Sequence, residues 1–255
     1  MIPSTAELLD AAIGFARLGG AHTLRYFRTS LEVIRKSDRS PVTIADREAE
    51  WIIREAILAR YSDHGIIGEE HGVVNPDARV QWVLDPIDGT VSFIHGIPLY
   101  TTLIGVLVDG APIVGIIYAP ALDELCDAAV GMGTRLNGAP VRVRATTDLA
   151  DATFLTTDEG NIRKHGYEAP ALALREACRI HRTWGDAYGH MMVATGRADV
   201  MFDPILNIWD AAALYPCVTE AGGTYMDVTG KPDIRSGNGI SCAPGLRDAI
   251  RTTFS

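Results

Sequence analysis

The sequence is poor in cysteine, holds no long apolar run and has fewer basic than acidic residues. Its four cysteines have no C-x-x-C spacing, so we expect buried apolar side chains rather than zinc ligands or disulfides. The first residues, MIPSTAELLD, lack the basic segment and apolar run of a secretory signal, and we expect a cytoplasmic protein. Charges, glycine or proline interrupt the longer apolar stretches, so we expect no membrane-spanning segment.

The excess of acidic over basic residues limits which molecules the protein can bind. Asp and Glu number 32 against 23 Lys and Arg, which gives a formal net charge of −9 at pH 7. Nucleic acid favours clustered Lys and Arg, so we expect no nucleic acid as the main partner. A phosphorylated small molecule remains open as a substrate, because cations held by acids reverse the local field. Serine and cysteine nucleophile motifs are absent, and the seven histidines show no metal-ligand pairing.

Helical spacing predicts two helices in the first quarter of the chain. One helix begins at Ser4 and ends near Gly19-Gly20, because glycine favours helix ends. After a loop, KSDRSPVT, Thr43 is the expected N-cap of a second helix that has Ile44 and further apolar residues on its buried face.

Strands and helices then alternate along the chain. With 255 residues, of which 47% are hydrophobic, the protein can bury a sizeable core as one large domain or two small ones. β-rich runs follow the second helix, and Asp109-Gly110 reads as the turn of a hairpin. The second half mixes strands with helices, and the seam between the halves is expected near residues 145–152. This order predicts an α/β or α+β protein built of layers.

Two carboxylates stand three residues apart in the stretch WVLDPIDGT, Asp85 and Asp88. Acids this close repel each other unless protons or cations neutralise them, although Asp, Pro and Gly also form ordinary surface turns. Glu69 in IIGEE and Asp210 in IWDAAAL likewise lie at the end of an apolar element, beside Gly or Trp. Oxygen ligands without histidine suit Mg²⁺ or Mn²⁺, and the Ile87 carbonyl adds a further oxygen. Two such ions, about 3.5–4 Å apart, are a known device for phosphoryl transfer.

Gly89 and Thr90 extend this hypothesis. If a short helix begins here, its free N–H groups can bind a phosphate oxygen. The Thr90 hydroxyl, oriented by Asp46, can take a proton from the attacking water and pass it on. Each acid alone has an ordinary explanation, since Asp46 suits a helix dipole and Glu69 or Asp210 suits solvent or a helix start. The hypothesis therefore depends on the combination.

The motifs GEE, WVLDPIDGT with FIHGIPLYTTLIGV, and WDAAALYPCVTEAGG resemble the inositol monophosphatase family of Mg²⁺-dependent, lithium-sensitive phosphatases. Motif order and spacing match along nearly the whole chain. The resemblance implies helix pairs alternating with mixed sheets (αβαβα), two or three Mg²⁺ per site with Mn²⁺ as a substitute, and a homodimer. We expect a single catalytic unit over 1–255, with most metal ligands in 1–147 and the substrate contacts and last metal ligand in 148–255.

The resemblance also implies a role for each site residue. The metal ligands that it implies are Glu69, Asp85, the Ile87 carbonyl, Asp88 and Asp210. Thr90 with Asp46 would activate the water, and Glu70 would orient it and help to hold a third ion. The N–H groups of Gly89 and Thr90 would hold the phosphate, with Lys36 nearby in a loop that is one residue shorter here.

The second half bears on the substrate. Family members that act on inositol phosphate hold its hydroxyls with a Gly-Thr-Ala segment and a Glu near the last metal ligand, whereas this chain has Gly185-Asp186-Ala187 and Asp203. Carboxylates favour a cation, and histidinol phosphate carries an ammonium and an imidazole. GDAY and SPVTIADREAE also resemble the histidinol-phosphatase branch, so Asp186, Ala187, Asp203 and Asn207 are the expected substrate contacts. The alternative is that Asp186 caps the following helix and Asp203 belongs to a turn.

Other functions fit parts of the sequence. Inositol 1-phosphate and other small phosphate esters are alternative substrates. The haloacid dehalogenase class carries Asp-x-Asp-Gly-Thr and phosphorylates its first Asp, but here Pro86 and Ile87 separate the acids, so we expect direct attack by water without a covalent intermediate. Some relatives contact the transcription machinery, and we expect that role to be minor or additional because every metal ligand is present.

Overall fold

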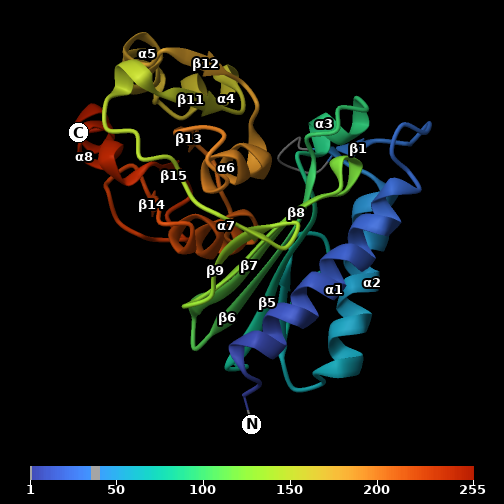
Figure 1. Ribbon diagram of the computed structural model, residues 1–255. Helices are drawn as coiled ribbons and strands as arrows, with labels where there is room; N and C mark the ends of the chain where they lie inside the picture. The colour runs from blue at the N-terminus through green and yellow to red at the C-terminus, as the bar shows by residue number, and fades with distance from the viewer. Residues whose placement is uncertain (1, 36–40) are drawn as a thin grey trace.

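The computed structural model describes residues 2–35 and 41–255. In this part of the chain, helices and strands stack in five layers around an eight-stranded and a five-stranded sheet (Figure 1). Helices α1 and α2 cover the outer face of the larger sheet, α6 and α7 lie between the sheets, and α4, α5 and α8 cover the smaller sheet. The αβαβα arrangement that the sequence predicts is therefore confirmed.

The eight-stranded sheet holds most of the first half. Its strands, in spatial order, are β10 (Ala139–Val141), β9 (Gly133–Leu136), β8 (Glu124–Ala129), β7 (Ala111–Ala119), β6 (Thr101–Val108), β5 (Val80–Asp88), β3 (Gly65–Gly68) and β4 (Gly72–Val74). Strands β3 and β5 run parallel, and the other neighbours are antiparallel. Helices α1 (Thr5–Leu24) and α2 (Ile44–Arg60) pack their buried apolar residues against β5, β6 and β7. The carboxyl ends of β3 and β5 lie side by side, which brings the GEE and DPIDGT motifs together.

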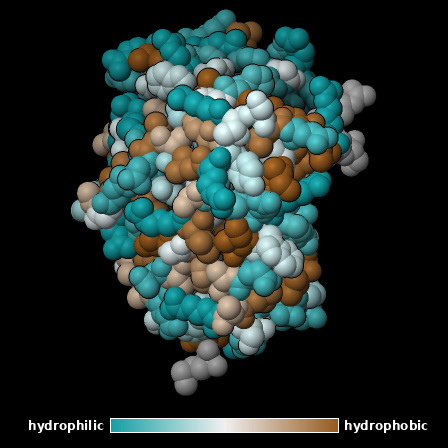
Figure 2. Space-filling view, turned by 90° about the vertical axis from the view of Figure 1, so that its right-hand side faces the viewer, coloured by the Kyte–Doolittle hydropathy of each residue, from teal (hydrophilic) through white to brown (hydrophobic). Residues whose placement is uncertain are grey.

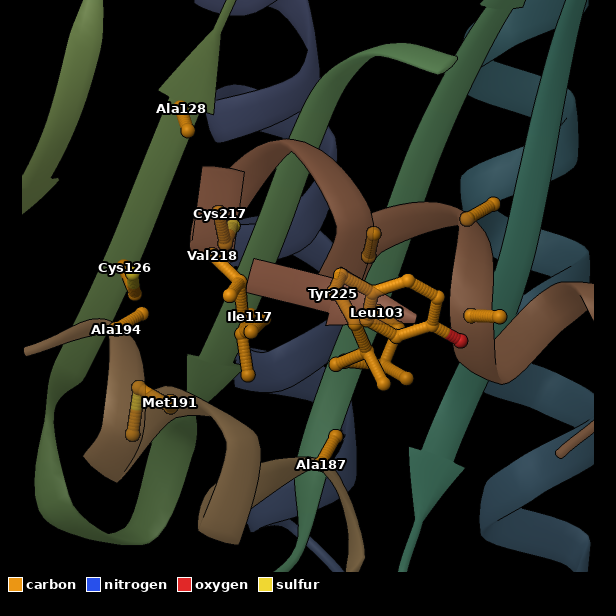
Figure 3. Close-up of a cluster of buried hydrophobic side chains, with 14 of the residues drawn as sticks. Leu103, Ile117, Cys126, Ala128, Ala187, Met191, Ala194, Cys217, Val218 and Tyr225 are labelled. Atoms are coloured by element: carbon orange, nitrogen blue, oxygen red, sulfur yellow. The ribbon is translucent and has the colours of Figure 1, made fainter. Parts of the chain in front are cut away.

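Helices α6 (Asp186–Ala194) and α7 (Ile208–Glu220) form the middle layer. Figure 3 shows Met191 and Ala194 from α6 and Cys217 and Val218 from α7 facing the sheet side chains. Helix α7 lies unusually close to the strands, because a Cβ on Gly105 or Gly115 would overlap the backbone of α7. Glycine inside a strand often marks such a close approach of another backbone.

The five-stranded sheet belongs to the second half. Its strands, in spatial order, are β12 (Ile180–Arg182), β11 (Thr153–Thr156), β13 (Val200–Asp203), β15 (Gly239–Cys242) and β14 (Thr224–Met226). The helices on its outer face are α4 (Glu159–Lys164), α5 (Glu168–Ala177) and α8 (Arg247–Thr253). The remaining elements are the short strands β1 (Ile34–Arg35) and β2 (Pro41–Val42), helix α3 (Thr90–Ile94) and the 3₁₀ turns η1 (Pro120–Leu122), η2 (Leu149–Asp151) and η3 (Pro244–Leu246).

The structure corrects three local expectations. Helix α1 continues past Gly19-Gly20 to Leu24, because these glycines let the helix approach Ile53 and Tyr118 closely rather than ending it. Ile44, expected on the buried face of α2, is 47% exposed at the start of that helix. Part of the expected loop before Thr43 forms the short strand β2, while Lys36 lies outside the described residues.

Other expectations hold. Thr43 caps α2, and Asp109 and Gly110 form the β6–β7 turn with positive φ angles. All four cysteines are free and buried. Among the described residues, no helix combines the length and apolar character needed to cross a membrane. How the chain divides into folding units stays a prediction.

The face that carries α1 and α2 mixes hydrophilic and apolar residues (Figure 2). Exposed apolar side chains on these two helices include Leu18, Leu24, Ile44 and Trp51. Apolar area of this kind is available for a protein contact. The expected homodimer remains a prediction.

Candidate active site

The end of β5 presents the two closely spaced acids. Residues three apart on a regular strand point to opposite faces of a sheet, so Asp85 and Asp88 would normally diverge. The β5–β6 ladder is irregular here: Asp85 pairs with Leu103 and Asp88 pairs with Thr101, with a register shift between them. Such a bulge re-aims side chains. Carboxylate oxygens of Asp85, Asp88 and Asp210 consequently lie within 4.8 Å of one another.

A backbone N–H fixes one oxygen of each of these three carboxylates. The amide of Ile87 donates to Asp85 Oδ1 at 3.0 Å, which orients the carboxylate within its own turn. Backbone amides at the N-terminal ends of two middle-layer helices hold the other two acids. Ala187 N–H donates to Asp88 Oδ2 at 2.7 Å, and Asn207 N–H donates to Asp210 Oδ2 at 2.6 Å. The cluster is therefore preorganised by three separate elements.

The electrostatics of the cluster favour a bound cation. Burial, and then the charges of Glu69, Asp88 and Asp210, raise the pKa of Asp85 well above its ordinary value. Burial and neighbouring acids raise the pKa of Asp88 and Asp210 in the same direction. Three carboxylates that repel one another in a partly buried position offer only oxygen ligands, which is the donor set that hard divalent cations prefer. The residues present therefore fit a metal ion of the Mg²⁺ type.

Glu69 and Glu70 follow directly after β3. The Glu69 amide donates to the Leu84 carbonyl at 3.2 Å, which anchors the turn to β5. Glu69 lies outside the 4.8 Å group, but it lines the larger cavity described below, and its charge raises the pKa of Asp85. The Glu70 amide donates to Glu50 in α2 at 2.7 Å. The structure thus places Glu69 beside the cluster, and the metal role of both acids stays a prediction.

Thr90 begins α3, and Gly89 precedes it with a φ of +78°, a conformation that glycine adopts readily. The Thr90 hydroxyl lies 3.1 Å from the Ile87 carbonyl and 3.5 Å from Asp46 Oδ1. Asp46 Oδ2 accepts from the Thr43 amide at 2.8 Å and from its hydroxyl. Asp46 therefore has both of the surroundings that the sequence suggests. Its Oδ2 belongs to the capping box at the start of α2, and its Oδ1 faces Thr90.

Two adjoining cavities open beside the cluster. The smaller has a volume of about 100 Å³ and reaches Asp88, Asp203 and Asp210. The larger, about 330 Å³, reaches Glu69, Gly89 and Thr90. Both cavities are lined by Thr157, Asp158, Asn161 and Asp186. A phosphate near Thr90 would thus have room for an attached group beside Asp186.

Asp186 lies at the start of α6 with a φ of +52°, a left-handed conformation that Asp tolerates better than most residues. Its amide donates to the Thr157 hydroxyl at 2.7 Å. Burial, and then the charges of Asp203, Asp210 and Asp158, raise the pKa of Asp186 to about 7. Gly185 is the N-cap of α6, and Asp186 is not its cap, so the helix-cap alternative does not hold.

The other three expected substrate contacts, Asp203, Ala187 and Asn207, are less available to a substrate than Asp186. Asp203 lines the smaller cavity, but its two oxygens contact the Thr157 hydroxyl and His190 Nε2, the latter at 3.2 Å. Ala187 is buried and turns its amide toward Asp88. Asn207 is exposed at the N-cap of α7 and is not among the residues that line either cavity. Of the four expected contacts, Asp186 has the position best suited to a substrate.

Sequence reasoning missed several residues of the site. Thr157, Asp158 and Asn161 line both cavities. The sequence did mark their position, because the expected strand TFLTT ends at Thr157 and Asp158 follows it directly, and the end of a strand is a place where a sheet can carry a site. Glu50 supports the GEE turn from α2, and its only signal is a charged residue at helical spacing from Asp46.

Comparison with known proteins identifies the chain as a phosphoric monoester hydrolase. The family model described as inositol monophosphatase family matches residues 4–253, and the chain belongs to this family. A histidinol-phosphatase of Chlorobaculum parvum is 44% identical over 92% of this chain and 91% of its own. The Nus factor SuhB of Salmonella typhimurium is 36% identical over 95% and 94% of the two chains. A solved inositol monophosphatase from Zymomonas mobilis superposes with a TM-score of 0.89 at 32% identity, covering 99% of each chain.

Proposed function

We propose that the protein is a Mg²⁺-dependent phosphatase that hydrolyses histidinol phosphate. The observation that carries the substrate assignment is the position of Asp186, which lines both cavities, the smaller of which also reaches Asp88 and Asp210 of the carboxylate cluster. The similarity to the Chlorobaculum parvum histidinol-phosphatase supports the same substrate. Two or three Mg²⁺ ions, or Mn²⁺ in their place, would be held by Glu69, Asp85, Asp88, Asp210 and the Ile87 carbonyl, with Glu70 beside them.

In the proposed mechanism, this chain orients the phosphate and moves one proton. Bound at the carboxylates, Mg²⁺ supplies positive charge for the phosphate oxygens and lowers the pKa of the attacking water. The N–H groups of Gly89 and Thr90 hold the phosphate at the start of α3. As the water oxygen bonds to phosphorus and the ester P–O bond breaks, Thr90 Oγ accepts the water's proton and gives its own to Asp46 Oδ1. The leaving oxygen keeps the electron pair of the broken bond and takes a proton from solvent water, which releases the alcohol. No covalent enzyme intermediate forms.

The proposed substrate carries cationic groups that the charges of the site would favour. Histidinol phosphate carries an ammonium and an imidazole that can be protonated, and a charged hydrogen bond to a carboxylate contributes about 1.5–3 kcal/mol. Asp186 supplies this carboxylate on the cavity wall, and Asp158 adds a second negative group nearby. Inositol 1-phosphate offers only neutral hydroxyls beyond its phosphate.

A second candidate function comes from the SuhB relatives. These relatives are Nus factors, and the Salmonella typhimurium protein is 36% identical to this chain. A role as a binding module for the transcription machinery is therefore the alternative.

A cytoplasmic location and a homodimer stay predictions of the sequence.

The first experiment compares kcat/KM for histidinol phosphate and inositol 1-phosphate with the purified protein in Mg²⁺, with EDTA as a control. We expect at least about a tenfold preference for histidinol phosphate, which corresponds to 1.4 kcal/mol, and no activity in EDTA. Asp210→Asn should abolish turnover, whereas Asp248→Asn, an exposed acid in the first turn of α8, should not. A preference for inositol 1-phosphate would overturn the substrate but keep the phosphatase. Activity on neither ester would favour the binding module.

A further inference from the structure

The carboxylate of Glu50 is a buried charged group that the mechanism above does not use. Glu50 lies in α2 and is fully buried. Its Oε2 accepts from the Glu70 amide at 2.7 Å, and its Oε1 accepts from the His71 amide at 3.0 Å. One side chain of α2 therefore holds two consecutive backbone amides of the turn that follows β3.

Gly68 and Arg54 both accommodate the Glu50 carboxylate beside this turn. A Cβ on Gly68 would overlap the Glu50 carboxylate, so only glycine at the end of β3 leaves it room. Arg54, one helical turn further along α2, is also buried and donates to Glu50 Oε1 at 3.1 Å and to the Gly72 carbonyl at 2.9 Å. Burial raises the pKa of Glu50, whereas the two amides and the guanidinium oppose that shift.

A buried ion pair contributes little net stability, because the loss of hydration offsets the attraction. Stability alone therefore does not account for the buried pair of Glu50 and Arg54. The turn that Glu50 holds contains Glu69, so we look for its role there. The Glu69 amide is fixed to Leu84, and its carboxylate acts on the pKa of Asp85. The turn is thus held from two sides, by β5 at Glu69 and by α2 at the next two residues.

We propose that Glu50 is a positioning residue that fixes the Glu69–Glu70 turn and thereby sets the affinity of the site for Mg²⁺. This inference rests on the proposed function, in which Glu69 is a metal ligand. Glu50 acts through the backbone of the turn and touches neither metal nor substrate.

The test is the dissociation constant for Mg²⁺, measured by titration calorimetry on metal-free protein. Glu50→Gln keeps the size of the side chain, but its NH₂ group must face one of the two amides, donor against donor. We expect the dissociation constant to rise at least about tenfold, as for other residues that orient metal ligands. The KM for histidinol phosphate at saturating Mg²⁺ should not change. Glu55→Gln, an exposed acid on the same helix, should leave both values unchanged.

A second variant keeps the test valid if Glu50→Gln folds poorly. Gly68→Ala retains the charge of Glu50 but pushes its carboxylate away from the turn, and it should weaken Mg²⁺ binding in the same direction. In a Glu69→Gln background, Glu50→Gln should have little further effect, because its influence passes through Glu69.

The outcomes separate the two hypotheses. A lower melting temperature with unchanged Mg²⁺ affinity would show a purely structural role for Glu50 and overturn the inference alone. Absence of Mg²⁺ binding by the unmodified protein would overturn both the inference and the proposed function.

Discussion

In the proposed function, the single residue Asp186 gives the site its preference for a substrate that carries a cation. Its left-handed φ of +52° restricts the substitutions that can test it, because a β-branched residue such as Thr is strained there, whereas Asn is tolerated. Asp186→Asn removes the charge and keeps the backbone. We expect KM for histidinol phosphate to rise about tenfold, since a charged hydrogen bond becomes a neutral one.

The measurement is a pair of kinetic titrations, one in histidinol phosphate and one in Mg²⁺. The Mg²⁺ concentration for half-maximal activity should stay within about twofold of the unmodified protein, because Asp186 is not a proposed ligand. The KM for inositol 1-phosphate is the control and should not rise, since this ester has no cationic group. Equal loss on both esters would assign Asp186 to the fold of the site instead.

Residues of the site differ in how far the sequence could reveal them. Asp85, Asp88 and Asp210 stand in local patterns of acids beside Gly or Trp, and the structure brings them together. Glu50 and Thr157 act across elements, on a turn after β3 and on the start of α6. A local pattern can mark the position of Thr157 at the end of a strand, but it records neither contact, because each contact depends on how distant segments pack. The sequence therefore predicted the clustered acids better than the residues that support the site from other elements.

At the scale of an element, helix α1 shows two different uses of glycine. Gly20 is buried, and a methyl group there would meet the ring of Tyr118 and Pro120, whereas Gly14 faces open space. Gly20→Ala should lower the free energy of unfolding by about 1–3 kcal/mol, because overpacking outweighs the gain in helix propensity. Gly14→Ala, in the same helix, should raise it by about 0.5–1 kcal/mol.

Urea unfolding of both variants checks this pair. A stabilising Gly20→Ala would show that the helix can move away from the sheet at no cost. The expected helix end at Gly19-Gly20 was wrong for the same reason, since glycine marks a helix end only where the chain is free to turn. Here the chain after Gly20 stays helical, with Thr23 buried, and the helix ends at Leu24.

The layered fold could be predicted as a class from the alternation of strands and helices, but its arrangement could not. Which helices lie between the sheets depends on contacts such as those of Gly105 and Gly115 with α7. These glycines read in the sequence only as weak strand positions. The order of the layers came from the resemblance to a known family.

For the molecule as a whole, we expect the acidic site to link stability to pH and to metal binding. Without metal, burial and mutual repulsion raise the pKa of Asp85, Asp88 and Asp210, and that of Asp186 to about 7. The unfolded chain has aspartate pKa values of about 3.9, so between these values the folded state binds more protons. The free energy of unfolding of the metal-free protein should therefore fall as the pH rises from about 4 to about 7, because the folded state must give up protons that it binds more tightly than the unfolded chain does.

Mg²⁺ should reverse that loss, because it replaces the protons at the same carboxylates. Thermal unfolding in EDTA and in millimolar Mg²⁺ gives the melting-temperature gain at each pH, and other titrating groups cancel in the difference. We expect the gain at about pH 8 to exceed that at about pH 5 by about 3 °C or more, which is about 1 kcal/mol for a chain of this size. Asp210→Asn should reduce the gain at the higher pH, since it removes one of the three clustered carboxylates. An equal gain at both pH values would mean that Mg²⁺ binds away from these acids.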